Sequence, residues 1–269
     1  MVIPEDVEWA ARKADSQAVL AWLEAGNDVN DVCSCGWTLL TIIAQGWDTP
    51  ITDAHVDLAR VLLQRGADPT LFRAPEHLSY STGLVPLKWA SRADGPASTK
   101  LVALLLEAGA DVNQTCDCGH TALGESIMFF NIDAGRSTRD VVALLLRAGA
   151  SLDDISTSWV RWGVPQCVRS AEELMCEREQ TNVSLRMKNH VSYDLTIDET
   201  WIAIKDLIAR VRAAGSWDEY FNPRKEVLSL RTLALRGRAE VRPDEKSIQF
   251  LVDSPDEIVW HVLAYWPAE

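Results

Sequence analysis

The chain has 269 residues, of which 47% are hydrophobic and 24% charged, so it has the composition of a globular protein with one long or two modest domains. Its 39 acidic and 26 basic side chains give a net charge of −13, which argues against sequence-independent binding to nucleic acid or to an anionic membrane. The longest apolar runs are only about six residues, too short to span a bilayer. Six cysteines without a secretory start to the sequence indicate reduced thiols, so we expect the cytoplasm or the nucleus rather than secretion.

An internal repeat dominates the first part of the chain. Four segments share an apolar helical face that ends in glycine, followed by a short polar turn: 19–30, 59–70, 102–113 and 142–153. Their glycines, Gly26, Gly66, Gly109 and Gly149, recur at intervals of 40, 43 and 40 residues. Glycine directly after an apolar helical run is typical of a left-handed helix end. The aspartates of the turns are expected to accept hydrogen bonds from nearby backbone amides.

A second motif precedes the later copies of the first. It is clearest at 36–44 and 119–127, and a degenerate copy is present at 83–90. Its threonines are expected to cap helix starts. The two motifs together resemble those of ankyrin repeats, G-x-T-P-L-H-x-A and V-x-x-L-L-x-x-G-A-D-x-N, over about residues 5–155. The resemblance implies stacked units of a turn and two helices that bind other proteins.

The sequence departs from the ankyrin pattern in three respects. Each unit is about seven to ten residues longer than the usual period of about 33, and the additions are expected between the two helices. The usual histidine of the second motif is replaced by Thr41, Lys88 and Gly124. The first unit lacks the second motif, which is typical of a terminal capping repeat.

The periodicity stops after residue 155. We expect a short helix at 170–177, an amphipathic helix that Asp198 caps and Gly215 ends, a helix near 225–238 and a last helix from Pro255. The apolar face of the second helix is formed by Trp201, Ile204, Leu207, Ile208 and Val211.

The segment of about 224–266 resembles a SOCS box, a short helical module often found behind ankyrin repeats. The resemblance implies that Leu230 inserts into an elongin protein and that Pro255 lies in a segment that contacts a cullin. The family's usual cysteine is replaced by Ala234, its next apolar anchor by Arg238, and only one of its two prolines is present.

Motifs for chemistry are scarce. Two C-x-C pairs, Cys33/Cys35 and Cys116/Cys118, occupy the same turn position two repeats apart, on the order of 20 Å from each other, so they are expected to be turn residues rather than one zinc site. The five histidines show no metalloprotease spacing, and no nucleophile elbow or phosphate loop is present. The sequence therefore predicts no enzyme, cofactor or metal.

The eleven tryptophans suggest two roles. Trp22 and Trp89 occupy core positions of the repeat and are expected to be buried. Five aromatic residues lie at turn tips or near the lengthened loops and are candidates for partner contacts, because exposed aromatics are enriched at binding hot spots: Trp37, Trp47, His120, Phe129 and Phe130. The alternative is that they pack against those loops.

These observations predict an all-α protein: an ankyrin-repeat solenoid of about four units at 1–155, a connector with a degenerate repeat and an amphipathic helix at 156–215, and a C-terminal helical segment at 216–269. The predicted function is non-catalytic protein binding through the concave face and turn tips. The alternative is a substrate adaptor of a cullin-type ubiquitin ligase, and an enzyme in the C-terminal region is a minor alternative. Residues 1–155 carry 21 acidic and 11 basic side chains, a balance suited either to a basic partner or simply to solubility.

Overall fold

The computed structural model of the protein describes residues 2–46, 50–71, 85–93, 95–115, 120–130, 136–157, 168–187 and 193–221. These residues are mostly helical, which confirms the prediction of an all-α chain. Their regular strands are β1 (Ser156–Thr157) and β2 (Val168–Arg169), which pair antiparallel. Within this described part, no helix is both long and apolar enough to cross a membrane.

The chain divides into two compact units, residues 1–213 and residues 214–269. The second unit is described only over 214–221, where α11 (Trp217–Tyr220) begins after Ser216, whose hydroxyl accepts a hydrogen bond from the backbone of Glu219. The helices predicted near 225–238 and from residue 255 lie outside the described residues.

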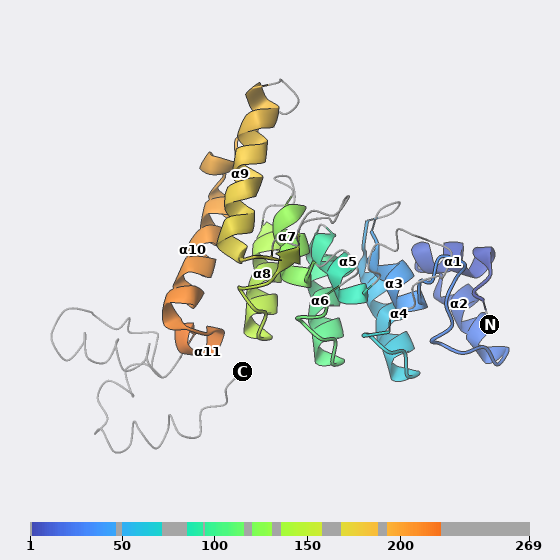
Figure 1. Ribbon diagram of the computed structural model, residues 1–269. Coiled ribbons are helices and arrows are strands. Elements are labelled where there is room, and N and C mark those ends of the chain that lie inside the picture. The colour runs from blue at the N-terminus through green and yellow to red at the C-terminus, as the bar shows by residue number, and fades with distance from the viewer. Residues whose placement is uncertain are drawn as a thin grey trace, which may run out of the picture. The chain divides into compact units, whose positions relative to one another are not determined.

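Four helix pairs follow one another in the first unit. They are α1 (Glu5–Arg12) with α2 (Ser16–Glu24), α3 (Leu39–Ala44) with α4 (Asp53–Gln64), α5 (Pro86–Arg92) with α6 (Pro96–Glu107), and α7 (Ala122–Met128) with α8 (Arg136–Arg147). Figure 1 shows the first helices of the pairs in one row and the second helices in another. Neighbouring first helices pack against each other, as do α4, α6 and α8. Eight residues separate α3 from α4 and seven separate α7 from α8, as predicted for lengthened segments between the helices of a pair. The prediction is wrong for the third pair, because only three residues separate α5 from α6.

The helices begin and end at the residues that the motifs predict. The hydroxyl of Thr38 accepts a hydrogen bond from the backbone of Thr41, and that of Thr121 accepts one from Gly124, each at 3.2 Å. The glycine after each second helix has a φ between 88° and 94°. Side chains with a Cβ are strained in this left-handed conformation, which explains why glycine recurs there.

Asparagine side chains connect successive turns. The amide of Asn30 donates to the carbonyl of Gly66 (3.1 Å), and its Oδ1 accepts from the backbone N–H of Asp68 (2.8 Å). Asn113 makes the same two bonds to Gly149 and Ser151, at 3.1 and 2.8 Å. Each bridge joins one helix pair to the next at the same point.

The second turn departs from this pattern because Thr70 stands where the first and third turns carry asparagine. Here the third turn supplies the bond to the second: the side-chain amide of Gln114 donates a hydrogen bond to the backbone carbonyl of Thr70 at 2.9 Å. The turn aspartates Asp28, Asp68 and Asp111 each accept a hydrogen bond from the backbone two residues later, as predicted.

Gly124, in the first turn of α7, lies against the chain that follows α8. A Cβ on Gly124 would lie 2.2 Å from the carbonyl oxygen of Ile155. The same oxygen accepts a hydrogen bond from the backbone of Thr121 at 3.1 Å. A side chain at residue 124 would therefore separate the two segments.

Two long helices follow the fourth pair. α9 (Ala171–Met187) packs on α7 and is longer than the predicted helix at 170–177, because its polar second half hides the apolar periodicity. α10 (Glu199–Ala214) buries the five apolar residues predicted for it. Asp198 caps its start, because the Asp198 carboxylate accepts a hydrogen bond from the backbone N–H of Trp201 at 2.7 Å. The Arg212 guanidinium of α10 donates hydrogen bonds to the carboxylates of Glu172 in α9 and of Asp153 in the turn after α8, each at 2.8 Å.

Candidate functional site: the ends of the first helices

The first helices of the second, third and fourth pairs are buried along almost their whole length. Every side chain of α3 is buried, and only the last residue of α5 and of α7 is partly exposed. The buried set includes the charged residues Lys88 and Glu125. In the row of first helices, surface that is open to a partner therefore lies on α1 and at the ends of α3, α5 and α7. The second helices and the turns also carry exposed residues.

Arg92 and two aromatic rings form the exposed end of α5 and α7. The guanidinium carbon of Arg92 lies 3.6 Å from the ring centre of Phe129 and 5.5 Å from that of Trp89. Trp89 is buried, as predicted, whereas Phe129 is 40% exposed. Burial lowers the pKa of Arg92, although the charge of Glu125 opposes this shift. Stacking over the rings keeps a cation and an aromatic surface together at the protein surface.

A similar group lies at the end of α1. The guanidinium carbon of Arg12 is 5.2 Å from the ring centre of Trp37 and 5.9 Å from that of Trp9, and Arg12 also pairs with Glu8 at 2.8 Å. The ammonium of Lys13 lies 6.0 Å from the centre of the Trp9 ring. Trp37 is only partly exposed, whereas Trp9 is 55% exposed. The sequence did not single out Trp9, because the first unit lacks the second motif that fixes its register.

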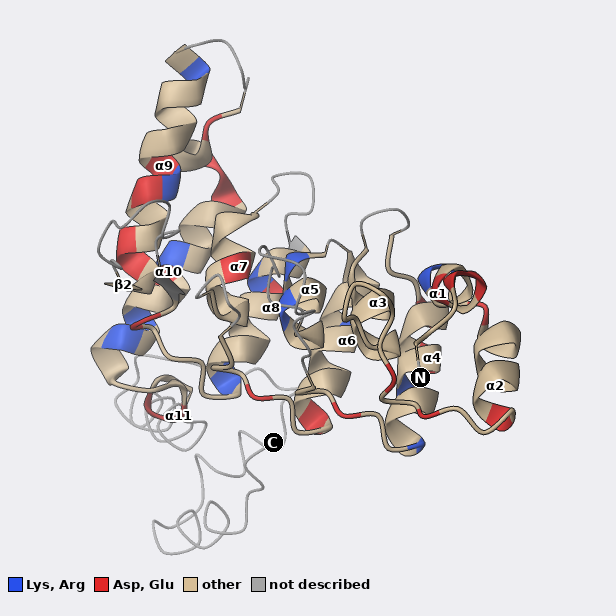
Figure 2. Cartoon of the chain, turned by 45° about the vertical axis from the view of Figure 1, so that its right-hand side comes forward, with Lys and Arg blue, Asp and Glu red and all other residues tan. Residues whose placement is uncertain are grey.

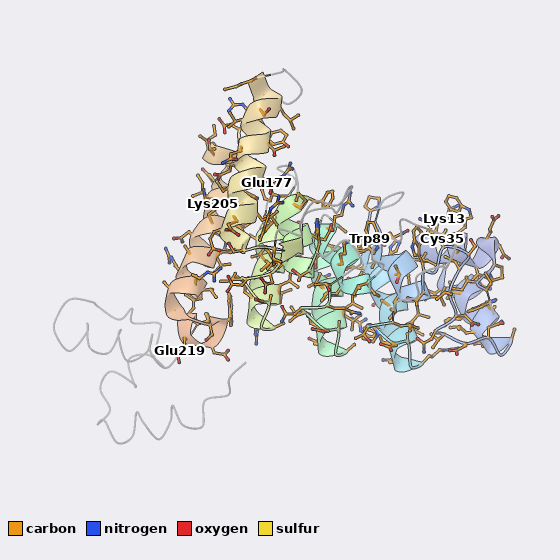
Figure 3. The ribbon with its side chains drawn as sticks, in the orientation of Figure 1. Lys13, Cys35, Trp89, Glu177, Lys205 and Glu219 are labelled. Carbon is orange, nitrogen blue, oxygen red and sulfur yellow. The ribbon has the colours of Figure 1, made fainter. Side chains whose placement is uncertain are left out.

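An open groove of about 550 Å³ lies between α1 and α2. Trp9 and Trp22 supply its largest apolar surfaces, and Asp6, Lys13 and Asp15 supply its charges. The remaining lining residues are Val7, Ala10 and Ala18. The prediction that Trp22 is a buried core residue is wrong, since it is partly exposed in this groove. Figure 3 labels Lys13 in this region and Trp89 farther along the helix pairs.

Three ionisable residues are buried together between α5 and α7. The ammonium of Lys88 lies 3.1 Å from Oε1 of Glu125, and Nδ1 of His120 lies 3.2 Å from the same oxygen. Burial alone would raise the pKa of Glu125, but the hydrogen bond with His120 and the charge of Lys88 outweigh it, so this pKa lies below its ordinary value. Among the described residues, Oε2 of Glu125 has no hydrogen-bond partner. The cluster joins neighbouring helices and is closed to a large ligand.

Two expectations of exposed aromatic residues are wrong. His120 is 5% exposed, because the residue before the capping Thr121 turns inward to reach Glu125 rather than outward at a tip. Phe130 is 3% exposed and packs on Trp201 of α10, with 5.1 Å between the ring centres. Both residues contribute to the interior.

The other predicted contact residues are placed only in part. Trp37 and Phe129 are at the surface, in separate groups at the ends of α1 and α7. Trp47, Leu230 and Pro255 lie outside the described residues.

The first C-x-C pair lies in a tight turn. The backbone N–H of Cys33 donates a hydrogen bond to the carbonyl of Trp37, and the backbone N–H of Gly36 donates one to the carbonyl of Cys33, each at 2.9 Å. Burial raises the pKa of the Cys33 thiol. Cys116 and Cys118 are not described, and no group of three or more potential metal ligands occurs within the described ranges.

Each turn after a second helix carries acidic side chains. Figure 2 shows acidic residues recurring along these turns, in agreement with the positions of Asp28, Asp68, Asp111 and Asp153. One oxygen of each of the first three carboxylates is used within its own turn. The negative charge is thus a regular property of this edge of the helix pairs.

No protein-family model matches the sequence, and no curated protein matches it.

Proposed function

We propose that residues 1–155 form an ankyrin-repeat domain and that the protein binds another protein through it without catalysis. The observation that carries the proposal is the pair of asparagine bridges, Asn30 to the turn at Gly66 and Asn113 to the turn at Gly149. The bridges lie at the same point, from the first unit to the second and from the third to the fourth, which supports a regular stack. A regular stack offers an extended surface rather than a single deep cleft.

The exposed aromatic groups support a role in protein binding. Trp9 and Phe129 are large apolar side chains at the surface, each beside a cation. Aromatic and arginine side chains are enriched at the energetic centres of protein interfaces. Because α3 and α5 bury nearly all their side chains, the proposed contacts lie at helix ends and turns rather than on the faces of these helices.

Affinity purification of the full chain tests the proposal. The intact protein should recover a partner, and Trp37→Ala or Phe129→Ala should reduce the recovery while leaving the melting temperature nearly unchanged. Asp57→Asn on the exposed side of α4 serves as a control away from both aromatic groups. Absence of any recovered partner, or recovery by both aromatic variants equal to that of the unmodified protein, contradicts the proposal as stated.

The same purification addresses the ligase-adaptor alternative. Full-length Leu230→Asp should lose elongin if the C-terminal segment acts as its resemblance to a SOCS box implies. Elongin recovered by the intact chain and lost in this variant assigns the adaptor function, whereas a partner retained by this variant is bound through the repeats.

A further inference from the structure

We propose that the groove between α1 and α2 binds a basic segment of the partner protein, with a lysine or arginine side chain seated against Trp9 and Trp22. This inference rests on the proposed function and adds the chemistry of the partner. The groove has an open volume of about 550 Å³, enough for more than one side chain, and both tryptophans line it. Its lining therefore combines aromatic faces with carboxylates.

The carboxylates of the groove are available to a ligand. Asp6 is exposed in the first turn of α1, and no hydrogen bond or ion pair of its side chain occurs within the described part of the chain. Asp15 is also exposed and uses Oδ1 to cap α2, accepting a hydrogen bond from the backbone of Ala18 at 3.2 Å. Its Oδ2 has no hydrogen bond within the described part of the chain. Two carboxylates beside indole rings favour a cation over a neutral or acidic group.

Lys13 shows that the Trp9 ring accommodates a cation. Its ammonium lies 6.0 Å from the ring centre, at the outer limit for a cation–aromatic contact, and Lys13 is otherwise exposed. An incoming cation would compete with this ammonium for the ring and would be repelled by its charge. Lys13 is therefore predicted to weaken binding of the basic segment, although it belongs to the groove.

The net charge of the whole chain also favours a basic partner. The net charge is −13, and the repeats carry most of it. Such a field accelerates the encounter with a basic partner and suppresses the encounter with an acidic one. The local chemistry of the groove and the long-range field thus select the same kind of segment.

Fluorescence anisotropy with the full-length protein and a labelled peptide tests the inference. The probe is a 12-residue peptide in which lysine and arginine alternate with glycine and alanine, and a second peptide carries glutamine at each cationic position. The cationic peptide should bind, the glutamine peptide should bind at least about tenfold more weakly, and added salt should reduce the difference.

Variants distinguish the groove from general charge attraction. Trp9→Ala should weaken binding roughly tenfold, and Asp6→Asn should weaken it several-fold, as expected for loss of a cation–aromatic or close charge contact. Lys13→Ala should tighten binding. Glu107→Gln, which makes the same charge change as Asp6→Asn at the exposed end of α6, should alter the affinity less than twofold.

Several results overturn the inference. These are equal weakening by Asp6→Asn and Glu107→Gln, weaker binding by Lys13→Ala, and equal or tighter binding of the glutamine peptide. Self-association of the protein that Trp9→Ala abolishes, without peptide binding, would assign the groove to a second copy instead. A partner that is captured through Phe129 but is indifferent to Trp9→Ala leaves the proposed function standing and removes only this inference.

Discussion

The side chain of Asn30 holds the backbone N–H of Asp68 at 2.8 Å, across an interval of 38 residues. Its amide donates to Gly66 in the same turn, so one side chain satisfies an acceptor and a donor of the next helix pair. The bridge recurs between Asn113 and Ser151 at the same interval. These bonds connect turns whose own conformations depend on glycine and aspartate.

Replacing Asn113 tests the energy of this bridge. Asn113→Ala removes both bonds and should lower the free energy of unfolding by about 1 kcal/mol, because water can replace the partners at this exposed site. Asn113→Asp keeps an acceptor for Ser151 but turns a carboxylate oxygen toward the Gly149 carbonyl, so it should cost at least as much. Urea unfolding of the two variants measures the difference, and an alanine variant as stable as the unmodified protein would show that the bridge contributes nothing.

Gly124 and Gly109 respond differently to alanine. Gly109→Ala places a Cβ in open space at a φ of +89° and should cost about 1 kcal/mol through backbone strain. Gly124→Ala forces a Cβ into the carbonyl of Ile155 and should cost about 3 kcal/mol, because α7 and the segment after α8 must separate. Thermal or urea unfolding of the matched pair distinguishes strain from steric exclusion. A larger loss at Gly109 would contradict the close approach at Gly124.

Lys88 is expected to stabilise the fold through Glu125, which lies beside it. Lys88→Met removes the ammonium that faces the buried carboxylate of Glu125 and should cost about 3 kcal/mol. The double variant Lys88→Met/Glu125→Gln should lose less than the two single losses added together. A double-mutant cycle in urea measures this coupling, and additive losses would place the two groups farther apart in solution.

The same carboxylate predicts a pH dependence. The pKa of Glu125 is lowered in the folded protein relative to its ordinary value, so its contribution to stability is present above the unfolded-state pKa and is lost as the pH falls through the lowered one. Glu125→Gln should therefore flatten the acid side of the stability curve relative to the unmodified protein. Urea midpoints between neutral pH and about pH 3 check this, and parallel curves would exclude a role for Glu125 in the acid response.

The cysteines predict a pattern of alkylation. Cys33 is buried and its thiol has a raised pKa, so little thiolate is available at neutral pH. Cys35 is partly exposed and Cys176 is exposed. Mass spectrometry after brief treatment with iodoacetamide should find Cys176 labelled and Cys33 unlabelled until denaturant is added. Early labelling of Cys33 would mean that the turn at 33–37 opens in solution.

The sequence predicted the parts of the fold that depend on local chemistry. Gly26 and its equivalents adopt left-handed conformations because only glycine does so without strain, and this requirement is visible as a repeat. The apolar face of α10 could also be predicted, because buried residues such as Trp201 and Ile204 follow helical spacing in the sequence.

Contacts between residues far apart in the chain could not be predicted from the sequence. Nothing in the neighbourhood of Lys88 reveals that Glu125 will face it 37 positions later, and a lysine after a helix start reads as a surface residue. The burial of Phe130 depends on Trp201 in a helix beyond the repeats. The groove beside Trp9 depends on the packing of α1 against α2 in a unit that lacks the second motif.

Mutual support between helix pairs is the property on which the proposed binding surface depends, and hydrogen exchange of Asn30→Ala measures it most directly. Compared with the unmodified protein, the variant should exchange faster not only at residues 28–31 but also in the turn at 66–70 and in the adjoining helix α4, because the next pair loses its tether. Faster exchange confined to residues 28–31, with α4 unchanged, would contradict the account.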